Sequence, residues 1–122
     1  MYCFAERFEG AVNELVREGP IKQRLARAYS ENLVDLKGQE FPDDLSSLFA
    51  ELSEALHRVE PVGTETRIEA SIKKMSTADA GRHAQTIVRL YGGLLHSADR
   101  TESLKIVKIE QPAAPKYLVR GS

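Results

Sequence analysis

Apolar residues recur three and four positions apart along most of the chain, which is the spacing of one face of an α-helix. The first such run covers residues 2–18 and the second covers residues 20–37. Gly19 and Pro20 separate them, because glycine accepts the left-handed conformation that ends many helices and proline tolerates a first helical turn. Gly38 is expected to cap the second helix in the same way.

The third run has the most regular apolar pattern in the chain. It opens at FPDDL, where Pro42 suits the start of a helix and Asp43 and Asp44 suit its positive N-terminal end. The helix is expected to continue to about Val59, because its apolar positions alternate three and four apart like a heptad repeat. This stripe consists of Leu45, Leu48, Phe49, Leu52, Ala55, Leu56 and Val59.

A fourth long helix is predicted to begin at Ser76, which stands at capping-box spacing from Asp79. Gly92 and Gly93 interrupt its apolar stripe, and each costs roughly 1 kcal/mol of helix stability relative to alanine. Two interpretations stay open. The glycine pair admits the close approach of another helix, or the regular helix ends near Tyr91.

Periodicity does not decide the conformation of two further segments. Residues 64–75 fit either a helix face or a strand, and a short helix is favoured because a single strand would need a partner. The helical pattern collapses after Ser97, and residues 104–110, LKIVKIE, fit a strand. An alternative arrangement would pair that strand with residues 66–72.

Together these elements predict an all-α fold, a small antiparallel bundle of about four main helices. Short loops between amphipathic helices favour antiparallel neighbours. Residues 1–103 would form this helical bundle domain, and residues 104–122 an irregular tail, extended or mobile and broken by prolines. The length of 122 residues suits one domain with a real core.

The net charge excludes few classes of function, because 17 basic and 18 acidic residues leave it at −1. The halves differ, with 7 basic and 12 acidic residues in 1–61 and 10 basic and 6 acidic residues in 62–122. The first interpretation is that the halves pack with complementary fields. The second is a weakly basic binding surface in the C-terminal half. Neither predicts a strong pull toward nucleic acid or an anionic membrane.

Cysteine and hydropathy indicate the compartment. Cys3 is the single cysteine, so no disulfide can form within the chain, as suits a reducing cytosol. No run approaches the ~20 apolar residues of a membrane span. The first ten residues lack the order of a signal peptide. We therefore expect a cytoplasmic protein that does not enter a membrane.

The sharpest candidate site lies where the third and fourth helices would meet. Arg58, Arg82 and His83 would approach one another there, beside His57, Lys73 and Lys74, if a compact excursion joins the two helices. The start of the fourth helix adds backbone N–H groups, and the whole would suit a phosphate or carboxylate. The alternative is a solvated face whose charges pair with neighbouring carboxylates, with His83 at the border of the apolar stripe.

Other chemistry finds little support. The histidines lack the companions of a metal site, so we expect neither a metal nor another cofactor. Asp43 and Asp44 are interpreted as helix-start residues, and His96 as a residue near a helix end. The basic run of Lys22, Arg24 and Arg27 is bracketed by glutamates, which makes a nucleic-acid surface an unfavoured interpretation. No catalytic residue is predicted, and we expect no enzyme.

The last feature of the sequence that bears on function is the large apolar surface on the helix faces. Tyr2, Phe4 and Phe8 crowd the first helix, and either a core or a second copy of the chain would cover them. The regular stripe of the third helix is open to the same two interpretations. The sequence therefore predicts a non-enzymatic protein that binds another protein or itself, as a homodimer. The alternative is a binder of a small anionic ligand at Arg58, Arg82 and His83.

Two stretches also carry a resemblance. EALHRVEPVG, residues 54–63, followed by SIKKMSTADAGRHAQTIVRLYGGLL, residues 71–95, resembles small uncharacterised bacterial helical proteins. The resemblance spans about half of the chain. It implies a helical fold and a bacterial source, and it assigns no activity to any residue.

Overall fold

The structure is a computed structural model that describes the backbone of residues 4–38 and 41–113, and the side chains up to residue 97 within those ranges. Over this part the fold is all-α, as predicted, and contains no strand. Its helices are α1 (Phe4–Leu15), α2 (Ile21–Asn32), α3 (Asp43–Leu56), α4 (Arg67–Lys74) and α5 (Thr77–Ala113).

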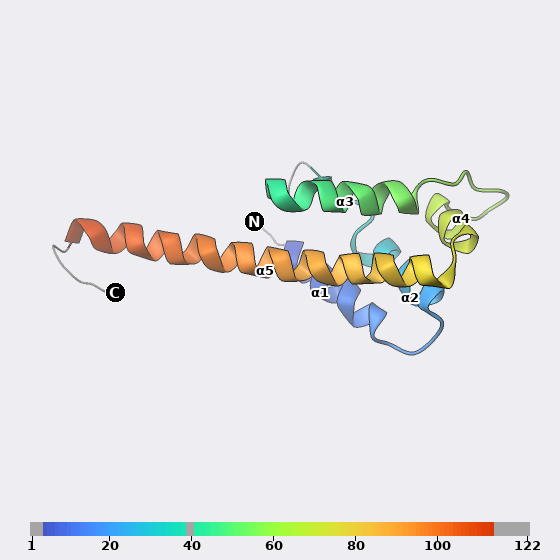
Figure 1. Cartoon of the computed structure of the whole chain (residues 1–122), viewed down its shortest axis with the longest axis horizontal. Coiled ribbons are helices and arrows are strands. Elements are labelled where there is room, and N and C mark those ends of the chain that lie inside the picture. The colour runs from blue at the N-terminus through green and yellow to red at the C-terminus, as the bar shows by residue number, and fades with distance from the viewer. Residues whose placement is uncertain (1–3, 39–40, 114–122) are drawn as a thin grey trace.

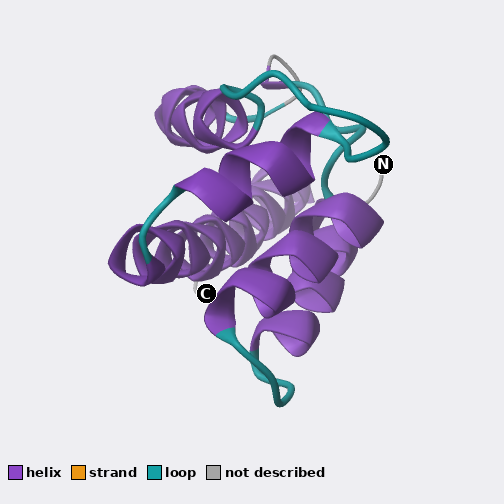
Figure 2. Ribbon diagram, turned by 90° about the vertical axis from the view of Figure 1, so that its right-hand side faces the viewer, coloured by secondary structure: helices purple, strands orange, loops and turns teal. Residues whose placement is uncertain are grey.

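Helix α5 is the axis of the molecule, because α1, α2 and α3 all pack on its N-terminal half (Figure 1). The short α4 lies across the end where α3 finishes and α5 begins, and it contacts α2 and α3 (Figures 1 and 2). The C-terminal half of α5 continues beyond the other helices as a projecting rod (Figure 1).

The core forms where the predicted apolar faces meet. Phe8, Leu25, Leu56, Ile87 and Leu90 are completely buried, so every long helix contributes at least one side chain. Burying each such side chain contributes about 1.5–3 kcal/mol relative to leaving it exposed. Most of the apolar residues of α1 and α3 are therefore buried within one chain.

Phe41, in the loop before α3, is also part of this core, although the helical spacing of apolar residues does not predict its burial. Its ring stacks on Phe49 at a centroid distance of 4.6 Å and on Phe4 at 4.8 Å. It also meets the edge of Phe8 at 5.9 Å. Aromatic contacts of this kind add about 0.5–1.5 kcal/mol each beyond the buried area. The loop therefore closes the end of the body at which α1 and α3 begin.

Three predicted helix ends are wrong by several residues. Helix α1 ends at Leu15 instead of near Glu18, α2 at Asn32 instead of near Lys37, and α3 at Leu56 instead of near Val59. Gly19 does adopt a positive φ of 116°, but it sits in the connecting loop. At the ends of α1 and α2, a side chain from the other helix donates to the carbonyl of the last helical residue, which stabilises these earlier ends.

The ambiguous segment 64–75 is a helix, α4, and its strand interpretation is wrong. A complete capping box begins it: the Thr66 side chain accepts from the Glu69 backbone N–H, and the Glu69 carboxylate accepts from the Thr66 backbone N–H. These bonds are 3.0 Å and 2.9 Å long. The Thr-x-x-Glu spacing is visible in the sequence and was the signal that could have decided the conformation.

Helix α5 passes through Gly92 and Gly93 without a break, so the alternative of a helix ending near Tyr91 is wrong. A Cβ at Gly93 would stand 2.7 Å from the Leu45 Cδ2 atom, so this glycine admits the close approach of α3. Nothing lies within 4 Å of the corresponding position at Gly92. Gly93 therefore serves the packing of α5 against α3, whereas Gly92 faces open space.

The helix also continues to Ala113, so the predicted strand over residues 104–110 is wrong. Residues 98–111 contain neither glycine nor proline, and no strand is present in the described backbone to pair with an extended segment. His96 consequently lies within the helix and not at its end. The rest of the predicted tail, residues 114–122, is outside the described part.

Candidate functional site

A groove of about 270 Å³ opens where the end of α3, α4 and the start of α5 converge. Arg58 and Val59 contribute from the segment that follows α3, Lys74 from α4, and Asp79 and His83 from α5. A wider depression between α3 and α5 shares Arg58 and His83 with it. The structure therefore brings two of the three predicted site residues into one concavity, which we call the α3–α5 groove.

Helical spacing explains why His83 borders this groove. It lies between Ala80 and Ile87, both fully buried, and is itself half-buried. Burial lowers the pKa of His83, and the positive charges of Arg82 and Arg58 lower it further. The neutral imidazole is thus favoured, and His83 offers an anion less than a charged histidine would.

Arg58 carries its own counter-ion. Its guanidinium donates to the Glu54 carboxylate one helical turn earlier, with a distance of 2.6 Å from Nη2 to Oε1. This contact lowers the pKa of the Glu54 carboxyl. Because both side chains are largely exposed, the pair contributes little to stability, but it leaves the guanidinium only partly open to a ligand.

Arg82, the third predicted residue, does not line the groove. It forms an ion pair with Asp79, one turn earlier on α5. Asp79 itself is held at the helix start, where its backbone N–H donates to the Ser76 hydroxyl at 3.0 Å. The groove therefore contains the guanidinium of Arg58, the ammonium of Lys74 and one carboxylate.

The remaining members of the predicted cluster lie elsewhere. Lys73 pairs with Glu65 at 3.1 Å, as expected for a solvated helix face. His57 turns toward α2, where its ring meets the edge of Tyr29 at a centroid distance of 5.7 Å. Its Nδ1 atom is 2.9 Å from the carbonyl oxygen of Ser53, so the Nδ1–H tautomer would donate there. His57 and His83 therefore face different sides of α3.

Ser71 supports the floor of the groove. It is almost completely buried, and its hydroxyl accepts from the backbone N–H of Val59 at 2.9 Å. This bond ties α4 to the segment that leaves α3. No sequence pattern indicated this role, because the contact depends on the path of the loop between the two helices.

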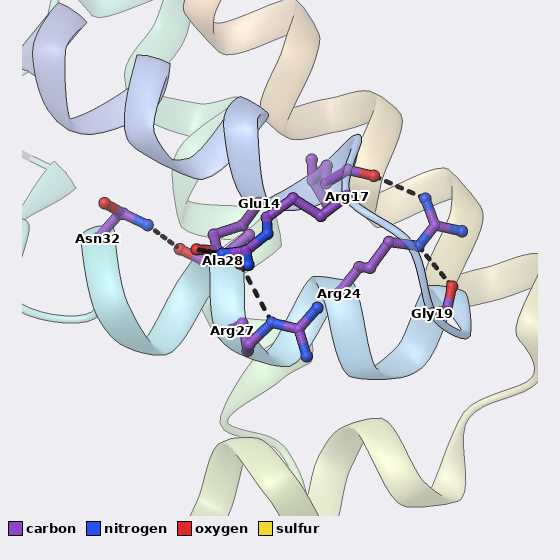
Figure 3. Close-up of polar contacts among 8 residues, drawn as sticks. Glu14, Arg17, Gly19, Arg24, Arg27, Ala28 and Asn32 are labelled. Atoms are coloured by element: carbon purple, nitrogen blue, oxygen red, sulfur yellow. Dashed lines mark hydrogen bonds and ion pairs between the residues drawn. The ribbon is translucent and has the colours of Figure 1, made fainter.

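Contacts within the chain occupy the basic run of α2, and Figure 3 shows those of Arg24 and Arg27. Arg24 donates to the carbonyl oxygens of Leu15 at 2.6 Å and Gly19 at 2.8 Å. Arg27 donates to the Glu14 carboxylate at 3.1 Å, and Lys22 to the Lys73 carbonyl at 3.2 Å. Each of the three basic side chains therefore has a structural role in this fold.

A second feature is an open line along the outside of α5, which we call the α5 stripe. Val88 and Leu95 are exposed by 50% and 44%, although Ile87 and Leu90 on the inner face are completely buried. Positions four and three apart complete the line. Two of them are glycines, and a Cβ added to either one would have no heavy atom within 4 Å. The α5 stripe consists of Gly81, Gln85, Val88, Gly92 and Leu95.

Two kinds of site are absent from the residues that the structure describes. Across these ranges, no three or more histidine, cysteine, aspartate and glutamate side chains gather to hold a metal ion. In the same ranges, no helix combines the length and the apolar character that crossing a membrane requires.

Comparison with known proteins assigns no family: no family model, curated protein or solved structure matches the chain significantly. The resemblance to small bacterial helical proteins stays a prediction. The features that bear on function are therefore the α3–α5 groove and the α5 stripe.

Proposed function

We propose that this protein acts without catalysis, by binding another polypeptide through the α5 stripe. The observation that carries the proposal is the exposure of Val88 and Leu95 on one face of the helix that organises the whole body. Seven residues separate them, so they lie two turns apart on the same face. Single exposed apolar residues are ordinary, but aligned ones on a rigid helix offer a docking surface.

Two other exposed valines lie outside the helices. Val16 and Val62 are exposed by 75% and 81%, and each lies in a loop and not on a helix face. A partner that recognises a helical stripe would therefore be insensitive to charge at Val62. The same partner would lose contact when charge enters the α5 stripe.

The experiment compares variants in affinity capture from lysate of the source cell. Val88→Asp combined with Leu95→Asp should remove the captured partner, because a carboxylate in an apolar contact is left desolvated. Val62→Asp is the control and should retain it. Helical circular dichroism of all three proteins checks folding. Equal capture by the double variant and the control would overturn the proposal.

A second candidate function rests on the α3–α5 groove, where Arg58 and Lys74 stand beside the start of α5. These groups would suit a small anion such as a phosphate ester. Against it, Glu54 pairs with Arg58, and burial favours the neutral form of His83. The test is calorimetric titration with inorganic phosphate: Arg58→Gln should weaken binding at least tenfold, and Arg67→Gln, outside the groove, should not. Absence of binding by the unaltered protein rejects this candidate.

Two finer expectations belong to the same proposal. A cytoplasmic location is supported by the single cysteine of the chain. An antiparallel arrangement of four main helices is supported by the course of α3 beside α5, since α3 ends near the point where α5 begins (Figure 1).

A further inference from the structure

We propose that the partner of the α5 stripe is a second copy of this chain, with the two α5 helices antiparallel across a two-fold axis near residue 97. This inference rests on the proposed function and names its partner. Within such a pair, two parts of α5 would face each other: the α5 stripe on the body of one copy and the projecting rod, residues 98–113, of the other.

The rod and the stripe match in length. Leu94 is the last buried residue on α5 among those whose burial is described, and the helix continues to Ala113 beyond the other helices (Figure 1). At 1.5 Å per residue, residues 98–113 span roughly 23 Å, and the stripe from Gly81 to Leu95 spans roughly 21 Å. A two-fold axis at residue 97 sets residue n opposite residue 194 − n, which lays the rod of each copy along the stripe of the other.

The rod and the stripe also match in register. Continuing the four-three spacing of the stripe beyond Leu95 reaches positions 99, 102, 106, 109 and 113. In the antiparallel pair, position 106 stands opposite Val88, 109 opposite Gln85 and 113 opposite Gly81. The sequence fills these positions with isoleucine, isoleucine and alanine. Two helices pair along a seam when apolar residues recur along it at this four-three spacing.

Charge along the rod favours the antiparallel direction. In a parallel pair every seam position meets itself, so the acidic positions 99 and 102 would face their own copies. Like charges opposed across a helix seam are destabilising. The antiparallel pair sets position 99 opposite Leu95 and position 102 opposite Gly92 instead. The two copies of each acidic position are then offset along the axis, by roughly 6 Å at position 99 and 15 Å at position 102, which weakens this repulsion.

The two open glycines of the stripe are costly without a partner. Gly81 and Gly92 each lower helix stability by about 1 kcal/mol, and neither has a neighbour within 4 Å that requires a missing side chain. Small residues at a seam let a second backbone approach closely. A stable dimer buries about 800 Å² on each partner. The stripe is too small to bury this area alone, so the rod must add to the interface. The two-fold axis forms the contact between rod and stripe twice.

The first experiment measures mass in solution. Sedimentation equilibrium of the full chain should give twice the monomer mass of 13.6 kDa. Val88→Asp should raise the dimer dissociation constant at least tenfold, and Val62→Asp should leave it unchanged. A monomeric mass throughout the micromolar range, or equal effects of the two substitutions, would overturn the inference. The proposed function would survive that result if capture of a different partner still depended on the α5 stripe.

The second experiment tests direction and register with spin labels. A Cys3→Ser background carries one new cysteine at Arg82, Arg89 or His96, which are all exposed on α5. The antiparallel pair predicts axial separations between equivalent labels of roughly 45, 24 and 3 Å, because the distance grows by about 3 Å per residue from position 97. A separation that is the same at all three positions would indicate a parallel pair and overturn the proposal.

Discussion

The guanidinium of Arg24, in α2, donates to the carbonyl oxygen of Leu15, the last residue of α1, at 2.6 Å (Figure 3). The reverse contact exists at the other end of the pair, where Arg7 Nε, in α1, donates to the carbonyl of Asn32, the last residue of α2, at 2.9 Å. The last carbonyls of a helix have no partner within it and carry partial negative charge. Each helix therefore caps the C-terminus of the other.

This reciprocal capping predicts that Arg24→Lys lowers stability although the charge is kept. Arg24 bonds two carbonyls, of Leu15 and Gly19, and an ammonium cannot reproduce the planar fork that does so. We expect urea denaturation to show a loss of roughly 1–2 kcal/mol. Arg17→Lys is the control, because the Arg17 side chain is exposed and its ion pair with Glu14 contributes little. Equal losses would show that the carbonyl contacts do not matter.

The two neighbouring glycines of α5 should respond oppositely to alanine. Gly92→Ala is expected to stabilise the protein by up to about 1 kcal/mol, because the site is open. Gly93→Ala gains the same propensity but places a methyl group against the Leu45 side chain, and overpacking costs typically ~1–3 kcal/mol. Thermal denaturation at one low protein concentration should rank Gly92→Ala above Gly93→Ala. The opposite ranking would refute the close approach of α3.

Removing the capping box should destabilise α4. Thr66→Ala deletes the acceptor of the Glu69 backbone N–H, which costs about 0.5–2 kcal/mol. Thr64→Ala, two residues earlier in an exposed loop, is the matched control and should change stability by less than about 0.5 kcal/mol. Chemical denaturation monitored by circular dichroism measures both. If the two substitutions were equivalent, the box would be dispensable.

His83 should make stability depend on pH in the mildly acidic range. Burial and the charges of Arg82 and Arg58 lower its pKa in the folded protein below the ordinary value of 6.5. The unfolded chain therefore binds the proton more readily, and stability falls as pH drops from about 7 through the folded-state pKa. His83→Gln should flatten this part of the profile, measured by urea denaturation between pH 7 and pH 5. An unchanged slope would exclude His83 as its source.

The sequence was a good guide to the inner faces of the helices. The three-and-four spacing identified Phe8, Leu25, Leu52 and Ile87, all of which are buried, because burial of an amphipathic helix depends mainly on its own periodicity. The spacing was less informative about ends. Arg7 and Arg24 cap the ends of α2 and α1 through contacts with the neighbouring helix, which no pattern within one helix records.

The candidate site divided in the same way. Arg58 and His83 were predicted to approach one another, and both line the α3–α5 groove. His83 lies at a predictable phase of α5, and Arg58 follows the end of α3 at the shared junction. Arg82 was predicted beside them, but one residue of helix turns a side chain by about 100°, and Asp79 holds it elsewhere. Ser71 was missed because its partner, the Val59 N–H, belongs to a loop.

By itself the sequence determined the all-helical class, the apolar faces and the capping signals, because each depends on residues within a few positions of one another. The tertiary structure decided where α1 and α2 stop and which charges are taken up by other helices. It also decided that the stripe of α3 is covered while Val88 and Leu95 on α5 are left open. Such outcomes depend on which helix packs beside which, and that is set by the sum of many contacts across the core.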